Sequence, residues 1–261
     1  MADWHVSNAY EGQKLDEAKQ QASQTPDRFW MPNDSSKELI FLTNEPFGIY
    51  EHCPKIDGGY KNWMTCLRGV TDEAPCCEIL GPKGRYFAGY YTVIDCSSYV
   101  DKKGVNHQYQ IKFLLAKSRT LKKLKMRTED NGPLTGTLYK ASRTDAKSPG
   151  CGDDFTFKRM VDLDKVFASV SYKGKKLTEH WAKASTNAEE LAKLQKIFQV
   201  ELDSNGAPIA KLVQFNYMEL LKPQDPKELR QFLKISNIEQ SDFDSPTAPV
   251  GKFGADDEVP F

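Results

Sequence analysis

The stretch Arg85-Tyr86-Phe87-Ala88-Gly89-Tyr90-Tyr91-Thr92-Val93-Ile94 decides the fold, because it alternates as a β-strand does. Successive side chains of a strand point to opposite faces of the sheet. A strand with aromatic residues on both faces can bury one set in a core and present the other to a ligand. One face of the expected strand carries Tyr86, Ala88, Tyr90 and Thr92, and the other carries Phe87, Gly89, Tyr91 and Val93.

Further strand patterns lie on both sides of this stretch. The turn at residues 101–104 leads into a partner strand over 107–117. Five or more short strands with one helix inserted late predict a mainly β fold, an OB-type five-stranded barrel, although other small β-barrels fit the same pattern. The other expected strands cover 38–43, 48–53, 60–67, 134–143 and 154–159, and the expected basic helix covers 118–129.

Helical patterns flank the expected barrel. Ser7 is a suitable N-cap for a helix that Pro26 would stop. After Val161, Thr186 and Glu189 form a capping-box pattern ahead of an apolar face. One more helix start is indicated by Asp225, Pro226 and Glu228, followed by apolar Leu229, Phe232 and Leu233.

The chain therefore divides into four parts. Residues 1–27 are expected to form an N-terminal helical arm and 28–160 the barrel. Residues 161–235 form a helical extension that packs on the barrel or mediates self-association into a homo-oligomer. Residues 236–261 contain Ser, Pro, Gly and Asp with little apolar content, which is typical of a disordered linker and tail.

The composition excludes several classes of protein. No apolar run approaches the roughly 20 residues that cross a bilayer. The first ten residues have neither the basic nor the apolar region of a secretory signal, so we expect a cytoplasmic location. In that reducing compartment the six cysteines are expected to be thiols or metal ligands rather than disulfides.

The net charge of zero conceals a separation of charge along the chain. From Ser236 onward there are six acids and one base, so this segment carries −5 and the remainder +5. Residues 112–147 contain ten bases and three acids. A basic body with a detached acidic tail suggests a polyanionic ligand and a separate role for the tail, although a charge of this size also fits a solvated surface.

The chain ends in Ala255-Asp256-Asp257-Glu258-Val259-Pro260-Phe261. Acids followed by a proline-stiffened apolar end make a compact peptide ligand, because an aromatic ring can fill a pocket while basic residues bind the carboxylates. This tip resembles the partner-recruiting tail of bacterial single-stranded-DNA-binding proteins. The resemblance implies that replication or repair proteins bind Asp256, Asp257, Glu258, Pro260 and Phe261.

The body of the chain resembles a phage family of single-stranded-DNA-binding proteins over roughly residues 28–160. The resemblance is carried by the segments 47–52, 62–67, 90–95, 119–124 and 142–155, with a weaker echo at 217–233. It implies an OB-fold that coats single strands during phage DNA replication, recombination or repair. No DNA-contacting residue follows from the resemblance alone.

The chemistry of single-strand binding selects candidate residues independently. Binding without sequence preference needs cations for the phosphates and exposed rings for the bases. For each ring, burial in the barrel core is an equally good explanation, and for the cations a solvated helix face is the alternative. The candidates are Trp63, Arg85, Phe87, Tyr91, Lys112, Lys117, Arg119, Lys122, Lys123 and Arg143.

A metal site is the third candidate. Some phage single-stranded-DNA-binding proteins hold zinc with one His and three Cys, which are residue types that zinc prefers. The resemblance leads us to expect a Cys-x-x-Cys pair here, whereas this chain has adjacent cysteines, which favours buried or free thiols over zinc. The candidate ligands are His52, Cys53, Cys66, Cys76 and Cys77.

The sequence thus predicts a non-enzymatic protein that binds and protects single-stranded DNA. It contains no nucleophile elbow, P-loop or paired-carboxylate signature. The rival hypothesis is a metal-dependent nuclease or annealing recombinase acting through Asp153 and Asp154. A protein-interaction adaptor with an incidental basic face is a further alternative.

Overall fold

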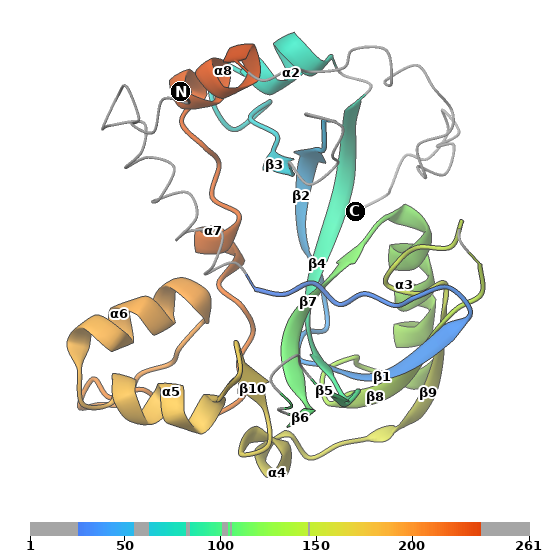
Figure 1. The fold of residues 1–261 in the computed structure, drawn as a ribbon, viewed down its shortest axis with the longest axis vertical. Coiled ribbons are helices and arrows are strands. Elements are labelled where there is room, and N and C mark those ends of the chain that lie inside the picture. Colours follow the sequence, from blue (N-terminus) through green and yellow to red (C-terminus); the bar gives the residue numbers. More distant parts are fainter. Residues whose placement is uncertain are drawn as a thin grey trace, which may run out of the picture.

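A computed structural model describes residues 26–54, 63–81, 84–100, 104, 106–145 and 147–235 (Figure 1). The architecture is a mixed sheet with a few helices, so the predicted mainly β class is confirmed. The principal strands are β1 (Ser35–Phe41), β2 (Phe47–His52), β3 (Met64–Thr65), β4 (Arg85–Asp95), β7 (Gln110–Ala116), β8 (Thr137–Arg143), β9 (Asp154–Met160), β10 (Ser171–Tyr172) and β11 (Lys175–Lys176). A separate two-stranded sheet contains β5 (Tyr99–Val100) and β6 (Asn106–His107).

Strand β4 connects the two halves of the molecule. Its C-terminal half pairs with β1 and β7, while its N-terminal half pairs with β2 in register from His52↔Arg85 to Phe47↔Tyr90. Figure 1 shows β4 rising from the lower body into an upper lobe that also contains β2 and β3. Any site built on the first residues of β4 therefore lies in the upper lobe.

The main sheet is open in the described part of the chain. Its strand order is β11-β10-β7-β4-β1-β8-β9, with β2 and β3 attached through β4. The pairing is antiparallel except between β10 and β7. Since β9 and β11 form the two ends of this order and are not paired with each other, the sheet differs from a closed five-stranded barrel.

Two hydrophobic cores lie on opposite faces of the C-terminal half of β4. Tyr90 and Ile94 belong to one core, which also includes residues of α5 (Leu177–Ala184), α6 (Ala188–Ile197) and α7 (Tyr217–Leu220). Tyr91 and Val93 belong to the other, which α3 (Ser118–Asn131) covers through Leu124. The alternation is confirmed, but this half of the strand is buried on both faces.

The helices match the expectations only in part. Helix α3 covers the expected basic stretch, and α8 (Pro226–Ile235) begins after Asp225, whose carboxylate accepts from the Lys227 backbone N–H at 2.8 Å. The capping box at α6 was wrong, because Asn187 caps this helix and accepts from the Glu189 and Glu190 N–H groups. The sequence patterns also missed α2 (Pro75–Leu80). A further short helix, α4 (Leu163–Phe167), follows β9.

Several expectations fall on residues outside the described part of the chain. These are the N-terminal arm up to residue 25 and the whole linker and tail, 236–261. No helix among the described residues is both long and apolar enough to span a bilayer.

Candidate nucleic-acid interface and metal centre

The pairing of β2 with β4 assigns the side chains of the upper lobe to two faces. Tyr50 lies opposite Phe87, Glu51 opposite Tyr86, and His52 opposite Arg85. Residues directly opposite each other in an antiparallel pair share a face, and the face alternates along the strand. Tyr50 and His52 with their partners therefore occupy one face, which we call the His52 face, and Glu51 and Tyr86 occupy the other, the Glu51 face.

A buried carboxylate organises the Glu51 face. Glu51 is almost fully buried and accepts a hydrogen bond from the Tyr90 hydroxyl. Burial raises the pKa of Glu51, although the Tyr90 and Tyr86 hydroxyls and the charges of Lys117 and Arg28 offset part of this effect. Lys117 and Arg28 are therefore close enough to this carboxyl to act on its pKa.

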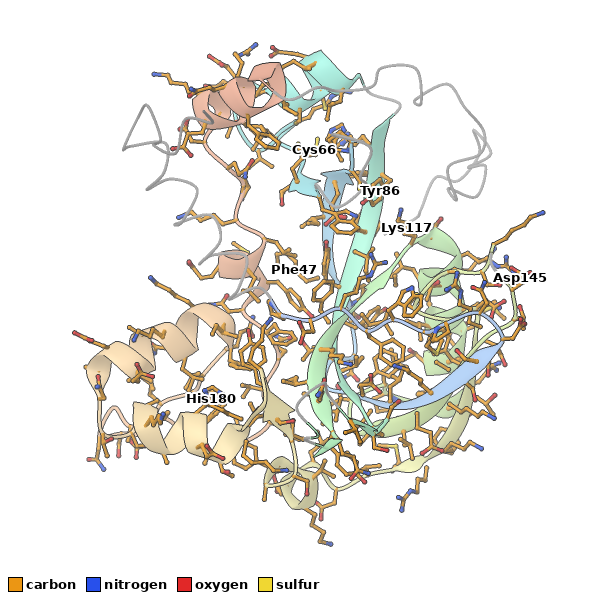
Figure 2. All side chains as sticks on the ribbon, in the orientation of Figure 1. Phe47, Cys66, Tyr86, Lys117, Asp145 and His180 are labelled. Atoms are coloured by element: carbon orange, nitrogen blue, oxygen red, sulfur yellow. The ribbon has the colours of Figure 1, made fainter. Side chains whose placement is uncertain are left out.

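Lys117 and Arg28 lie against the aromatic rings of the Glu51 face. The Lys117 ammonium is 3.8 Å from the centroid of the Tyr86 ring, and Figure 2 shows these two residues next to each other beside β4. The Arg28 guanidinium is 5.7 Å from the centroid of the Trp63 ring. Burial and the neighbouring positive charge of Arg28 lower the pKa of Lys117. The side chains of Lys117 and Arg28 therefore lie near each other on this surface.

The same surface continues along the chain that precedes β1. Trp30 lies two residues after Arg28, and this residue is 54% exposed. The Arg143 guanidinium is 5.9 Å from the centroid of this ring, and it donates to the Met31 carbonyl at 2.8 Å. We call the set Arg28, Trp30, Trp63, Tyr86, Lys117 and Arg143 the ring–cation surface.

The His52 face carries a second, smaller group of the same kind. The Arg85 guanidinium lies 3.7 Å from the centroid of the Tyr50 ring, and Tyr50 is 45% exposed. The Phe87 ring meets the Tyr50 ring edge-on at 5.5 Å. Phe87 can approach the backbone because its neighbour is Gly48, where a Cβ atom would come within 2.7 Å of the ring.

The structure separates the ten predicted DNA-binding residues. Trp63, Lys117 and Arg143 belong to the ring–cation surface, and Arg85 and Phe87 to the His52 face. Arg119 and Lys122 are exposed on α3. The other three, Tyr91, Lys112 and Lys123, have contacts within the body that compete with a role in DNA binding.

The contacts of these three residues lie within the body of the protein. Tyr91 is buried, with its ring edge-on to Phe41, so no base can stack on it. Lys123 donates from its ammonium to the Asp153 carbonyl. Lys112 is neutralised by Asp95, because its Nζ lies 2.8 Å from the carboxylate.

Asp95 is the centre of a charge cluster on the sheet. Lys37 Nζ lies 3.4 Å from the same carboxylate oxygen that Lys112 contacts. Burial alone would raise the pKa of Asp95, but Lys112, the Ser97 N–H and Lys37 lower it below its ordinary value. This carboxylate is therefore ionised at neutral pH and ties β4 to β1 and β7.

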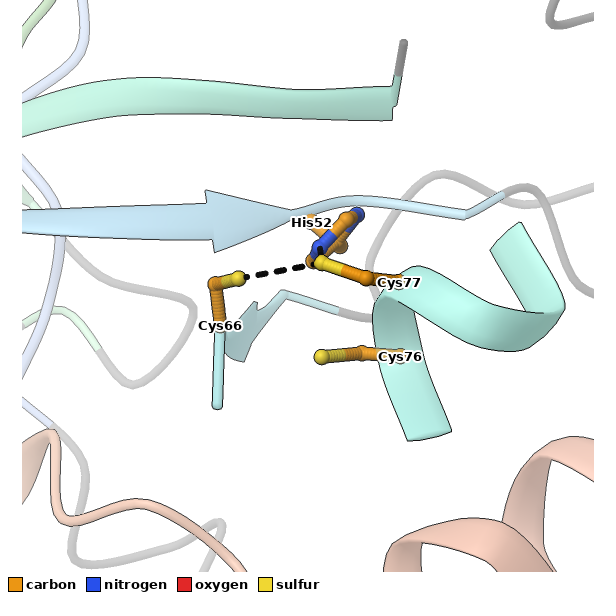
Figure 3. Close-up of side chains that lie close together, drawn as sticks. All are labelled: His52, Cys66, Cys76 and Cys77. Atoms are coloured by element: carbon orange, nitrogen blue, oxygen red, sulfur yellow. Dashed lines mark hydrogen bonds between the residues drawn. The ribbon is translucent and has the colours of Figure 1, made fainter. Parts of the chain in front are cut away.

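Four potential metal ligands come together on the His52 face, as Figure 3 shows. His52, Cys66, Cys76 and Cys77 each offer one ligand atom, and these atoms lie within 4.8 Å of one another. Cys66 Sγ is 3.5 Å from Cys77 Sγ, which is 3.4 Å from His52 Nε2. The cluster can hold a metal ion, and it is the one group of this kind found in the described residues.

The chemical state of the cluster also suits a cation. Burial and the nearby Arg85 charge lower the pKa of His52 to about 4, so the imidazole is neutral and free to donate a lone pair at neutral pH. Burial raises the pKa of Cys76, and the Leu67 backbone N–H, which donates to Cys76 Sγ at 3.3 Å, offsets part of this effect. Burial raises the pKa of Cys77 to about 12, so its deprotonation requires a nearby cation.

The metal ligands expected from the sequence include one residue, Cys53, that is not part of this cluster. Cys53 follows His52 directly and therefore points to the Glu51 face, where it contributes to the raised pKa of Tyr86. Cys76 and Cys77 are adjacent in the sequence, which weighed against a zinc site, yet both belong to the cluster. Helix α2 begins at Pro75 and directs both side chains towards β2 and β3. None of the six cysteines forms a disulfide.

Asp153 and Asp154, which the nuclease hypothesis requires, have structural contacts. The Asp153 carboxylate accepts from the Thr144 and Ser148 hydroxyls, both at 2.7 Å. The Asp154 carboxylate lies 3.3 Å from Arg127 Nη2. These contacts fix the turn ahead of β9.

Sequence reasoning missed Arg28, Trp30 and Tyr50 as site residues. Their positions in the chain carry no motif, and only the paired structure shows that a guanidinium lies over each ring. The expected partner-binding residues Asp256, Asp257, Glu258, Pro260 and Phe261 lie outside the described residues.

In comparisons with known proteins, no family model, curated protein or solved structure matches the chain.

Proposed function

We propose that the protein binds and protects single-stranded DNA without strong sequence preference during phage DNA replication, recombination or repair. One observation carries the proposal: three aromatic rings that are about half exposed, Trp30, Tyr50 and Trp63, each have an arginine guanidinium close to the ring. Every base offers a flat face that can stack on an exposed ring or on a guanidinium plane.

The cations around these rings supply the second requirement of single-strand binding. Lys117 and Arg28 are close enough to repel each other, and a phosphate between them would relieve that repulsion. Arg119 and Lys122 on α3 extend the positive charge beyond the rings. Stacking on rings and contacts with phosphates give affinity without sequence readout.

The fold is compatible with this role. The OB-type barrel implied by the resemblance remains our proposal for the body built from β1, β4, β7, β8 and β9. The open sheet supports it only at the level of a mainly β body with one helix, α3, inserted between β7 and β8.

The metal in the cluster of His52, Cys66, Cys76 and Cys77 is proposed to be zinc. A tetrahedral zinc with bonds of about 2.0–2.3 Å places its ligand atoms roughly 3.3–3.8 Å apart. The separations of 3.5 Å and 3.4 Å around Cys77 lie in that range. Four protein ligands fill the coordination of zinc, so the ion would support the upper lobe and leave no open position for chemistry.

Fluorescence titration with oligothymidine tests the proposal, using Trp63→Ala and Trp63→Phe. Loss of one stacked base costs about 1–3 kcal/mol, so W63A should raise Kd by about 5- to 150-fold while W63F retains most of the affinity. F157A, which removes an exposed ring on β9, is the matched control. If wild-type protein fails to bind oligothymidine in dilute buffer, the proposal is rejected.

The nuclease or recombinase alternative predicts a different result. Incubating labelled single strands with the protein and magnesium should leave them intact if the protein only coats DNA. Cleavage that disappears in D153N and D154N would establish the alternative.

A further inference from the structure

The upper lobe has a hydrophobic core of its own, and this core is very small. Its buried members are Met64, Cys66, Leu67, Cys76, Leu80, Leu229 and Leu233. Two of these seven residues are candidate metal ligands, and two others belong to α8. The metal cluster and the last helix of the described chain therefore share one core.

Helix α8 is fixed to the segments that carry the ligands by polar contacts as well. Arg230 lies 2.8 Å from Glu78 and 3.4 Å from Glu73, the two acids that flank the Cys76–Cys77 pair along the chain. Ahead of the helix, the Thr65 hydroxyl donates to the Leu221 carbonyl at 2.9 Å, next to Cys66. Figure 1 shows α8 and α2 side by side at the end of the upper lobe.

The surface on which α8 rests has little support apart from the cluster. Helix α2 has only six residues, and no side chain caps its N-terminus. Helices this short are not stable by themselves, and a core of seven residues is far below what holds an independent unit. The ligands from β2, from the segment after β3 and from α2 would be tied together by one ion.

We infer that metal occupancy of the cluster controls whether α8 docks on the upper lobe. This inference rests on the metal centre proposed above. When the ion leaves, α2 and the Cys66 segment are no longer held together, and the contact surface of Leu229 and Leu233 is lost. Because α8 is the last described element before the acidic tail, the metal also determines where on the molecule the segment from residue 236 begins.

The coupling has a consequence that can be measured from either side. If the metal favours docking of α8, docking of α8 must favour the metal by the same factor. Couplings of this kind are typically about 5- to 150-fold in affinity. Weakening the helix contact should therefore weaken zinc binding, although no residue of α8 is a ligand.

The test uses full-length protein and zinc itself. Zinc affinity is measured by competition with a chromophoric chelator for wild type, for L229A/L233A and for K227A/Q231A, a matched control on the exposed side of the same helix. We expect the Leu variant to bind zinc at least about fivefold more weakly and the control to stay within about twofold. In parallel, hydrogen exchange of residues 226–235 in wild type is compared before and after zinc removal, and protection should fall and return with zinc.

The outcomes are separable. If wild type binds no zinc, the metal centre itself is rejected, and the inference with it, while oligothymidine binding is judged on its own. If wild type binds zinc but the Leu variant has unchanged affinity, or α8 stays equally protected without zinc, the coupling is rejected and the metal centre stands. Should L229A/L233A fail to fold, the exchange measurement on wild type still decides.

Discussion

His52, the last residue of β2, and Cys53, which follows it, illustrate how alternation along an extended chain selects ligands. Both are residue types that zinc accepts, yet only His52 faces Cys66, Cys76 and Cys77. We predict that C53S keeps one zinc per chain, whereas C66S loses at least tenfold in zinc affinity, because one of four ligands is removed. Zinc stoichiometry and chelator competition measure both values.

C77S provides the companion variant, since its sulfur lies between His52 Nε2 and Cys66 Sγ. It should behave like C66S. Loss of zinc in C53S with retention in C66S would show that the ligands come from the other face of β2.

Asp95 allows a prediction on stability and pH. Its carboxylate is 2% exposed and Lys112 is 13% exposed, so D95N would leave a largely buried ammonium without its partner. We expect D95N to lower the free energy of unfolding by about 3 kcal/mol at pH 7. Urea denaturation monitored by tryptophan fluorescence gives this value.

The pH dependence follows from the sign of the Asp95 shift. The pKa of this carboxyl is lowered in the folded protein, so its stabilising effect is complete above the unfolded value of about 3.9 and is lost as the pH falls towards the folded value. The difference between wild type and D95N should therefore shrink on acidification below about pH 4. A difference that grows in acid would contradict the assignment.

At the scale of elements, α3 separates cations that meet solvent from those that hold the fold. Arg119 and Lys122 are exposed on this helix, whereas Lys123 donates to the Asp153 carbonyl. We predict that R119A/K122A reduces the salt dependence of oligothymidine affinity, with a log–log slope shallower by about 1.4 if each contacts one phosphate. Stability should stay within about 0.5 kcal/mol of wild type.

The matching control for this prediction is K183A, an exposed lysine on α5. It should leave the slope unchanged. K123A should instead lower stability through the turn ahead of β9. An unchanged slope in R119A/K122A would mean that DNA does not reach α3.

Elements with strong local patterns were predictable from the sequence. The alternation of β4, the basic helix α3 and the Asp225 start of α8 depend on residues close together in the chain, and all three are confirmed. Helix α2 was missed because its six residues, with two cysteines and no capping side chain, carry too little periodicity. Its position depends on packing against α8 instead.

The candidate site was predictable in residue type and only partly in position. Tyr91 and Trp63 are both aromatic, so the sequence offers them equally as residues on which a base can stack. In the structure Tyr91 lies in a core and Trp63 is half exposed. The pairing of Lys112 with Asp95 joins residues of two strands, so no local pattern reveals it. Arg28 and Trp63 are likewise distant in sequence, and only the fold brings them together.

At the scale of the whole molecule, the chain separates a basic body from an acidic end. Residues 1–235 carry +5 and 236–261 carry −5, so the tail can compete with DNA for the ring–cation surface. We predict that deleting residues 254–261 tightens oligothymidine binding severalfold at low salt and abolishes binding of replication or repair proteins. The gain should fade with salt, since the screening length falls from about 30 Å at 0.01 M to about 8 Å at 0.15 M.

Two full-length variants distinguish charge from the terminal ring in this competition. D256N/D257N/E258Q removes three negative charges and keeps Phe261, so it should tighten DNA binding at low salt almost as much as the deletion. F261A keeps the charges, so it should leave DNA affinity unchanged while weakening partner binding, because we propose that the ring fills a pocket of the partner. If affinity for oligothymidine is the same in the deletion, in both variants and in wild type at 0.01 M salt, the tail does not compete with DNA.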